Sequence, residues 1–249
     1  MKELFRGALF SIQFLTRIPV PCSIAPNESL IKKALMLFPL CGWGIGLLLS
    51  VVWWLANLSG PHNPFALAAI IIAAETLITG AFHLDGLADT GDALFSPGTS
   101  RDEKLSIMKD SRIGVMGAAA LIVALLLKTA LLTDLFNTQG WIVVLIYPVI
   151  GRWALVVSLV FSPYVRREGI GSRFSDAADH SILVIATLIM LPCFFLLFFP
   201  LTMVALILFF CTFRWYVHDR IGGITGDTLG AAAVLSETVF LLGAALWHV

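Results

Sequence analysis

The fold and the chemistry of this chain depend on one stretch of sequence, Gly80-Ala81-Phe82-His83-Leu84-Asp85-Gly86-Leu87-Ala88-Asp89-Thr90-Gly91-Asp92. It follows the apolar segment 65–79 and gathers three carboxylates and an imidazole in a chain with 13% charged residues. If the stretch is helical, Asp85, Asp89 and Asp92 share one face, within an arc of about 60°. Like charges on one face repel unless a cation lies between them. Carboxylates at this spacing suit Mg²⁺, which takes its other ligands from water and substrate phosphates.

The composition is that of a membrane protein. Of the 249 residues, 59% are hydrophobic, and the mean hydropathy is +0.93. Several apolar runs approach about 20 residues, the length of a helix that crosses a bilayer. The 16 basic and 16 acidic residues balance, so bulk charge gives no reason to expect nucleic-acid binding. We expect an all-α, polytopic helical membrane protein that forms a single integral membrane catalytic domain over residues 1–249.

The apolar runs predict seven membrane spans. They lie at about 34–58, 65–82, 113–132 and 141–161, then in a hairpin over 181–217 that breaks near Pro200, and finally at 228–247. The first apolar run, 8–15, is too short to cross a bilayer, which predicts an amphipathic or re-entrant helix at the N-terminus.

The distribution of Lys and Arg predicts the orientation. With the N-terminus inside, 14 of the 16 basic residues fall in inner segments and the outer turns hold none, as the positive-inside rule requires. The three long polar loops, 83–112, 162–180 and 214–227, then face the cytoplasm. We expect a multi-pass protein of the cell inner membrane whose active site faces the cytoplasm.

A second acidic centre opens the last span, at Gly222-Gly223-Ile224-Thr225-Gly226-Asp227-Thr228-Leu229-Gly230-Ala231. Helix N-termini present free amide groups and bind phosphate readily. We expect Thr225 and Gly226 to contact substrate, and Asp227 either to cap the helix or to add a metal ligand.

A basic loop precedes the span at 113–132. Its Lys109, Asp110 and Arg112 are expected to contact substrate, since Arg binds phosphate in a bidentate manner and Lys as a point charge. Alternatively, the two cations are only the basic flank of a span.

Glu75, Arg152 and Glu237 fall inside predicted spans, where an isolated charge is costly and needs a partner. We expect them to line a polar cavity that descends from the cytoplasmic face and contacts substrate. The alternative is that they pair with one another between helices.

Two aspartate clusters with nearby Lys and Arg fit metal-assisted phosphoryl transfer, in which cations bridge phosphate oxygens and neutralise developing charge. A membrane location favours an amphiphilic acceptor.

Three motifs in order now resemble the cobalamin synthase family, the adenosylcobinamide-GDP ribazoletransferases. They are the segments 83–90, 109–114 and 222–231, and the likeness extends to Phe14-Leu15-Thr16-Arg17-Ile18-Pro19-Val20-Pro21 and Phe38-Pro39-Leu40. One departure is Asp92-Ala93-Leu94, where the family usually has Gly after the aspartate. The difference concerns the turn after Asp92 and not its carboxylate.

The resemblance implies a reaction. The family transfers the cobinamide phosphate of adenosylcobinamide-GDP to a ribose hydroxyl of α-ribazole or α-ribazole 5′-phosphate, giving adenosylcobalamin or its 5′-phosphate and GMP, with Mg²⁺ as cofactor. Its partners here would be these two substrates and the lipid bilayer. Assembly of the chain into an oligomer is a further option that the resemblance does not decide.

The resemblance also implies roles for residues. Asp85, Asp89, Asp92 and Asp227 would hold Mg²⁺ on the diphosphate. Lys109 and Arg112 would neutralise the diphosphate and the departing GMP. His83 or one of the catalytic aspartates, Asp85 and Asp89, would accept the proton of the attacking hydroxyl. The second and last spans must then be neighbours.

Two other functions remain as alternatives. One is a CDP-alcohol-type phosphotransferase of phospholipid synthesis. The other is a divalent-cation or corrinoid transporter, a class that often contains internal repeats. Thr90-Gly91-Asp92 and Thr225-Gly226-Asp227 echo each other, but three residues are too few to define a repeat.

Overall fold

The fold is a bundle of helices, seen in a computed structural model that describes residues 2–21, 25–58, 63–98, 100–196 and 200–246. No β-strand occurs in these ranges, although Tyr164 and Ile224 form an isolated parallel bridge. The helices are α1 (Lys2–Leu15), α2 (Glu28–Met36), α3 (Phe38–Asn57), α4 (Pro64–Thr79), α5 (Phe82–Leu94), α6 (Arg101–Ile107), α7 (Val115–Phe136), α8 (Trp141–Phe161), α9 (Ile170–Ala177), α10 (His180–Met190), α11 (Pro192–Leu196), α12 (Pro200–Ile221) and α13 (Gly226–Leu246).

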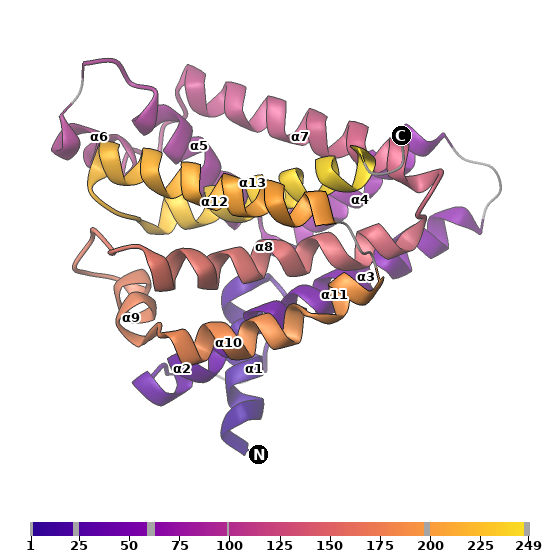
Figure 1. The fold of residues 1–249 in the computed structure, drawn as a ribbon, viewed down its shortest axis with the longest axis horizontal. Coiled ribbons are helices and arrows are strands. Elements are labelled where there is room, and N and C mark those ends of the chain that lie inside the picture. The colour runs from indigo at the N-terminus through magenta and orange to yellow at the C-terminus, as the bar shows by residue number, and fades with distance from the viewer. Residues whose placement is uncertain (1, 22–24, 59–62, 99, 197–199, 247–249) are drawn as a thin grey trace.

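Long apolar helices confirm the polytopic membrane architecture. Within the described ranges, α3, α7, α8, α12 and α13 are each long and apolar enough to cross a membrane, and α4 with α5 makes a sixth candidate if this bent pair is one span. Figure 1 shows α7, α8, α10 and α12 running along the long axis of the molecule, whereas α1 crosses that direction. The crossing agrees with the expected amphipathic helix, since α1 buries Gly7, Phe10, Ser11 and Leu15 on one side.

The expected count of seven spans is too high by this criterion, because the first arm of the predicted hairpin is short. Helix α10 has 11 residues, or about 16 Å of axis, roughly half of the hydrocarbon thickness. It ends before Pro192, because a proline has no backbone N–H to continue the helical hydrogen bonds. The predicted turn near Pro200 includes residues 197–199, which lie outside the described ranges, as do residues 59–62 of the predicted turn before α4.

A sharp bend separates the second predicted span from the acidic stretch. The axes of α4 and α5 differ by 94°, with both Gly80 (φ 65°) and Ala81 (φ 59°) in the left-handed region. That conformation is unfavourable for alanine. The surrounding contacts stabilise the bend, because the Arg17 N–H donates to the carbonyl of Ile78 (2.7 Å) and the Ala81 N–H to that of Thr76 (3.0 Å). The bend lays α5 against α7 and α13.

Helix α8 forms the centre of the core, with nearly all of its side chains from Val143 to Leu159 buried. Helix α3 packs against it so closely that a Cβ at Gly42 would lie 2.6 Å from the Cα of Val149, and one at Gly46 would collide with the Leu145 carbonyl oxygen. Packing of this kind needs small residues at the contact, as is common between membrane helices.

The three long polar connections gather at one end of the bundle. In Figure 1 the links from α5 to α6, from α8 to α9 and from α12 to α13 all lie at the left. Segments far apart in the sequence therefore meet at that end, as the predicted topology requires.

We expect Gly46→Val to destabilise the protein by about 1–3 kcal/mol through overpacking against α8, which corresponds to a melting temperature in detergent lower by roughly 5 °C. Gly44→Val on the same helix is the matched control, since a Cβ at Gly44 would have no neighbour within 4 Å. Equal melting temperatures for the two variants would contradict the close α3–α8 contact.

Candidate functional site at the end of the bundle

The backbones of α5 and α13 touch, so the last span lies against the acidic stretch beyond the bend rather than against α4, the predicted second span. A Cβ at Gly86 would lie 2.6 Å from the carbonyl oxygen of Asp227, and one at Gly230 would lie 3.1 Å from that of His83. Glycines in both motifs therefore permit the contact, because any larger residue would push the two helices apart. The contact brings the two acidic motifs, about 135 residues apart in the sequence, into one site.

The three aspartates of the first motif lie on one helix, as expected. Asp85 is exposed and Asp89 is half-buried, and within the described ranges neither carboxylate has a hydrogen bond or an ion pair. The negative charges of Asp85, Asp92 and Asp227 all act on Asp89, together with the positive charge of Arg166. Four carboxylates thus share a small region with one nearby guanidinium.

The donor chemistry of this region fits Mg²⁺, although no three-residue cage is formed. Among the described residues, no group of three or more His, Cys, Asp or Glu side chains is placed to hold a metal ion. Mg²⁺ commonly binds through one or two carboxylates and takes its remaining ligands from water and substrate phosphates. The free carboxylates of Asp85 and Asp89 meet that requirement.

Asp92 was expected to be a metal ligand, but its contacts are those of a helix cap. Its Oδ2 accepts from the Gly114 N–H (2.7 Å) and its Oδ1 from the Gly117 N–H (2.8 Å). Gly114 is the N-cap of α7 and Gly117 lies in its first turn, where backbone N–H groups lack partners within the helix. Asp92 therefore fixes α5 to the start of α7, with both oxygens engaged.

Asp227 lies beside Arg166, a residue of the loop 162–180 for which no role was predicted. Arg166 donates to Asp227 Oδ2 at 2.6 Å. The loop that carries Arg166 is fixed by two backbone bonds of 2.8 Å, from the Val165 N–H to the Ile224 carbonyl and from the Ile224 N–H to the Pro163 carbonyl. The pair was not predicted, and the one signal for it in the sequence is the presence of three arginines in the loop 162–180, Arg166, Arg167 and Arg173.

Thr225 is buried and has a structural role in the turn before α13. Its N–H donates to Thr228 Oγ1 (2.8 Å), and its own Oγ1 accepts from the Thr228 N–H (3.2 Å). This arrangement caps the helix and leaves no exposed hydroxyl for a substrate. Gly226 lines a neighbouring cavity, so its expected contact with substrate remains open.

The basic loop 109–112 lies at the surface. Arg112, with an 87% exposed side chain, donates from Nε to Asp110 Oδ1 (3.0 Å) and from its NH2 group to Oδ2 (2.6 Å). These hydrogen bonds lower the pKa of Asp110 to about 2. Lys109 is exposed. The loop is connected to the site through Gly114, which binds Asp92, and through Met108, whose sulfur lies 3.6 Å from the Thr225 hydroxyl.

Two cations bind the C-terminal end of α5. Lys104 Nζ donates to the carbonyls of Ala93 (3.3 Å) and Ser96 (3.0 Å), and Arg220 donates to that of Leu94 (3.0 Å). Positive charge at a helix C-terminus is favourable. Helix α5 is therefore fixed at its far end as well as along its sides.

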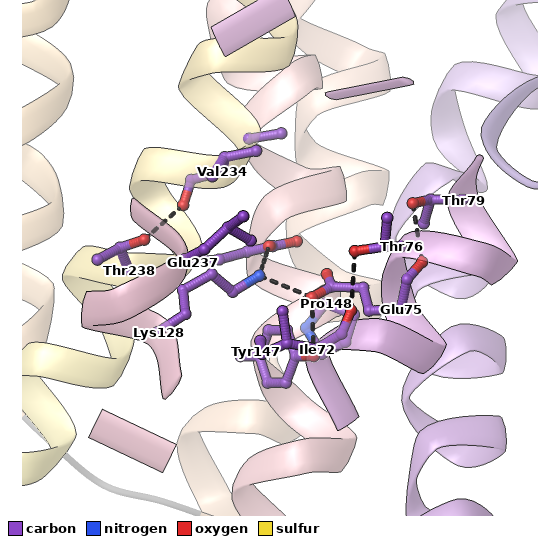
Figure 2. Close-up of polar contacts among 12 residues, drawn as sticks. Ile72, Glu75, Thr76, Thr79, Lys128, Tyr147, Pro148, Val234, Glu237 and Thr238 are labelled. Atoms are coloured by element: carbon purple, nitrogen blue, oxygen red, sulfur yellow. Dashed lines mark hydrogen bonds and ion pairs between the residues drawn. The ribbon is translucent and has the colours of Figure 1, made fainter. Parts of the chain in front are cut away.

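A buried charge cluster, made of Glu75, Lys128, Arg152 and Glu237, joins α4, α7, α8 and α13. Figure 2 shows Lys128 between the two glutamates, with Nζ 2.7 Å from an oxygen of each. Arg152 lies 2.5 Å from Glu237 and 3.9 Å from Glu75, and Tyr147 donates to Glu75 at 3.0 Å. Two positive and two negative charges balance, as a site away from water requires.

The three residues Glu75, Arg152 and Glu237 line a cavity, as expected, but they also pair between helices, and their contact with substrate stays a prediction. The cavity beside the cluster has a volume of about 20 Å³, enough for about one water molecule and too small for a whole substrate molecule. The alternative of pairing between helices is confirmed. Lys128 and Tyr147 were missed, although a lysine inside an apolar run was itself a signal.

His83 lies on the inner side of α5. It is 6% exposed, and its Nε2 has no hydrogen-bond partner among the described residues. Two residues of helix correspond to about 200°, so His83 and the exposed Asp85 point in nearly opposite directions. The imidazole borders the bundle interior rather than the acidic face, which weakens its expected role as the base.

Known proteins resemble this chain over nearly its whole length. The family described as cobalamin-5-phosphate synthase matches residues 7–245. The adenosylcobinamide-GDP ribazoletransferase of Geotalea daltonii is 37% identical, with 96% of each chain covered. Relatives of the same name from Pseudomonas fluorescens and Ralstonia pickettii are 36% and 35% identical, covering 95% and 99% of this chain and 98% of their own. No solved structure matches the chain.

Removal of the shared cation tests the buried charge cluster. We expect Lys128→Met to destabilise the protein by about 3–5 kcal/mol, because it leaves two buried carboxylates with one cation. Lys32→Met is the control, since Lys32 forms an exposed pair with Glu28 (3.0 Å) and such pairs contribute about 0–1 kcal/mol. Thermal unfolding in detergent measures both, and similar losses would argue against the cluster.

Proposed function

The chain belongs to the cobalamin-5-phosphate synthase family, and on that basis we propose that it transfers the cobinamide phosphate of adenosylcobinamide-GDP to a ribose hydroxyl of a ribazole. This is the final step of cobalamin biosynthesis. The structural observation that carries the proposal is the convergence of Asp85 and Asp89 with the Arg166–Asp227 pair. Carboxylates that can take a divalent cation and an arginine that can contact phosphate are the groups that such a transfer needs.

The bonds that change define what the site must do. The ribazole hydroxyl oxygen attacks the phosphorus that bears cobinamide, and the bond from that phosphorus to the bridging oxygen breaks. GMP leaves with the electron pair, and the hydroxyl proton passes to a base. Both the donor diphosphate and the departing GMP are anionic, so the site must neutralise negative charge on both sides of the transferred group.

Mg²⁺, held by Asp85 and Asp89, would neutralise charge on the diphosphate oxygens. Arg166 reaches the same region and can share its guanidinium between Asp227 and a phosphate oxygen. Lys109 and Arg112, exposed on the adjoining loop, supply further positive charge for the nucleotide. Asp92 holds this loop in place through Gly114, which makes Asp92 a positioning residue.

The site has a defined place relative to the proposed membrane. The acidic motifs and the long polar loops lie at the same end of the bundle (Figure 1). The positive-inside rule assigns the loop-bearing side, rich in Lys and Arg, to the cytoplasm. We therefore place the active site on the cytoplasmic face of the cell inner membrane, with the N-terminus inside, where water-soluble nucleotides are available.

The purified protein, supplied with adenosylcobinamide-GDP, α-ribazole and Mg²⁺, is expected to release GMP and form adenosylcobalamin. Asp85→Asn and Asp89→Asn should each lower kcat by about 100-fold or more, since they remove charge that acts in the transition state. Chelation of divalent cations should abolish turnover of the wild-type protein, and added Mg²⁺ should restore it. Asp102→Asn, at an exposed position in α6, is the control and should retain full activity.

The outcomes separate the two parts of the proposal. A wild-type protein that transfers phosphate from a CDP-alcohol, but not from the corrinoid donor, would overturn the assigned reaction. An Asp89→Asn variant that keeps its rate at limiting Mg²⁺ would overturn the metal assignment and leave the reaction intact.

A further inference from the structure

Beside the acidic site lies a cavity of about 210 Å³ that the reaction scheme above does not use. We call it the aromatic pocket, since five of its lining residues are Phe14, Phe38, Phe82, Tyr164 and Phe174. They come from α1, α3, α5, the loop after α8, and α9. Aliphatic side chains of α8, α9 and α13 complete most of the wall.

The rings of the pocket pack against one another. The centroid of Phe14 lies 4.9 Å from that of Phe174 and 5.6 Å from that of Phe82, the latter pair edge-to-face. Phe38 contacts Phe174 at 5.4 Å, also edge-to-face. Phe38 and Phe174 are buried behind the wall, whereas the half-buried Phe14 and the exposed Phe82 have ring surface free. These two rings can contact a flat aromatic ligand, which gains from stacking as well as from burial.

The pocket adjoins the groups assigned to phosphate chemistry. Arg166, which donates to Asp227, lines it, and so do His83 and Gly226 from the two motif segments. His83 lies between this pocket and the small cavity beside the buried charge cluster, and its Nε2 has no partner among the described residues. A flat ring held in the pocket would therefore carry its attached sugar toward Arg166 and Asp227.

We propose that the aromatic pocket binds the base of the nucleoside acceptor, the benzimidazole ring of the ribazole, and directs its ribose toward the Arg166–Asp227 pair. This inference rests on the proposed function. Most of the wall is apolar, with His83, Arg166 and Glu168 as its ionisable members, and an apolar wall suits the carbon-rich benzimidazole. Binding of guanine, whose N–H groups could donate to Glu168, is the competing outcome of the test. The pocket would thus select the acceptor, while the acidic motifs handle the donor diphosphate.

Binding of α-ribazole alone provides the direct test. Titration calorimetry in detergent, without donor or Mg²⁺, should show binding to the wild-type protein. Leu229→Trp, which fills the pocket, and Phe82→Leu, which removes an exposed ring from its wall, should each weaken binding about tenfold or more. Phe209→Leu is the matched control, because Phe209 is a half-buried ring on α12 that contacts Phe213 at 5.5 Å and does not line the pocket. This variant should bind α-ribazole as tightly as the wild-type protein does.

Steady-state kinetics give a second, independent readout. At saturating donor, both pocket variants should raise KM for α-ribazole about tenfold and change KM for adenosylcobinamide-GDP little. A rise in KM for the donor instead would place guanine or the corrinoid in the pocket and overturn the proposal. Wild-type affinity and kinetics in both variants would overturn it as well. A wild-type protein that binds α-ribazole but releases no GMP would refute the proposed function and not the pocket.

Discussion

One lysine shared by two glutamates holds the centre of this protein together. Charges buried among apolar helices are tolerated only when they are balanced and hydrogen-bonded, and Lys128 satisfies Glu75 and Glu237 at once while Arg152 completes the balance. The four residues come from four different helices, so they fix the mutual position of those helices. Two of these, α4 and α13, lead directly to the acidic motifs, and the cluster therefore sets the frame on which the site is built.

From this frame the site is assembled by close backbone contact together with side chains that bind helix ends. The bend after α4 lays α5 against α7 and α13, and glycines let its backbone rest on α13. Asp92 fixes α5 to α7, while Lys104 and Arg220 bind its last carbonyls. Asp85 and Asp89 are left without partners among the described residues. A rigid scaffold that presents unpaired carboxylates is suited to bind cation and phosphate without rearrangement.

Much of this could be predicted from the sequence, and the exceptions have a common cause. Apolar runs revealed the spans, and spacing alone placed Asp85 and Asp89 on one helical face. The distribution of Lys and Arg showed that the two motifs share an end of the molecule. What could not be predicted depends on partners distant in sequence: Asp92 meets the amides of α7, Arg166 meets Asp227, and Glu75 meets Lys128. The bend was missed because it requires Ala81 in a conformation that alanine rarely adopts.

The balance of the buried charge cluster also restricts how the sequence can vary over evolution. A neutral residue at any one of its four positions leaves an uncompensated charge among apolar helices, so single changes there are costly. Replacement of an acid together with a base keeps the sum at zero, and apolar side chains of similar volume can then fill the space. Lineages that drift at these positions should therefore do so in pairs, with one glutamate and one cation lost together. The exposed basic loop at 109–112 faces water and has no such restriction.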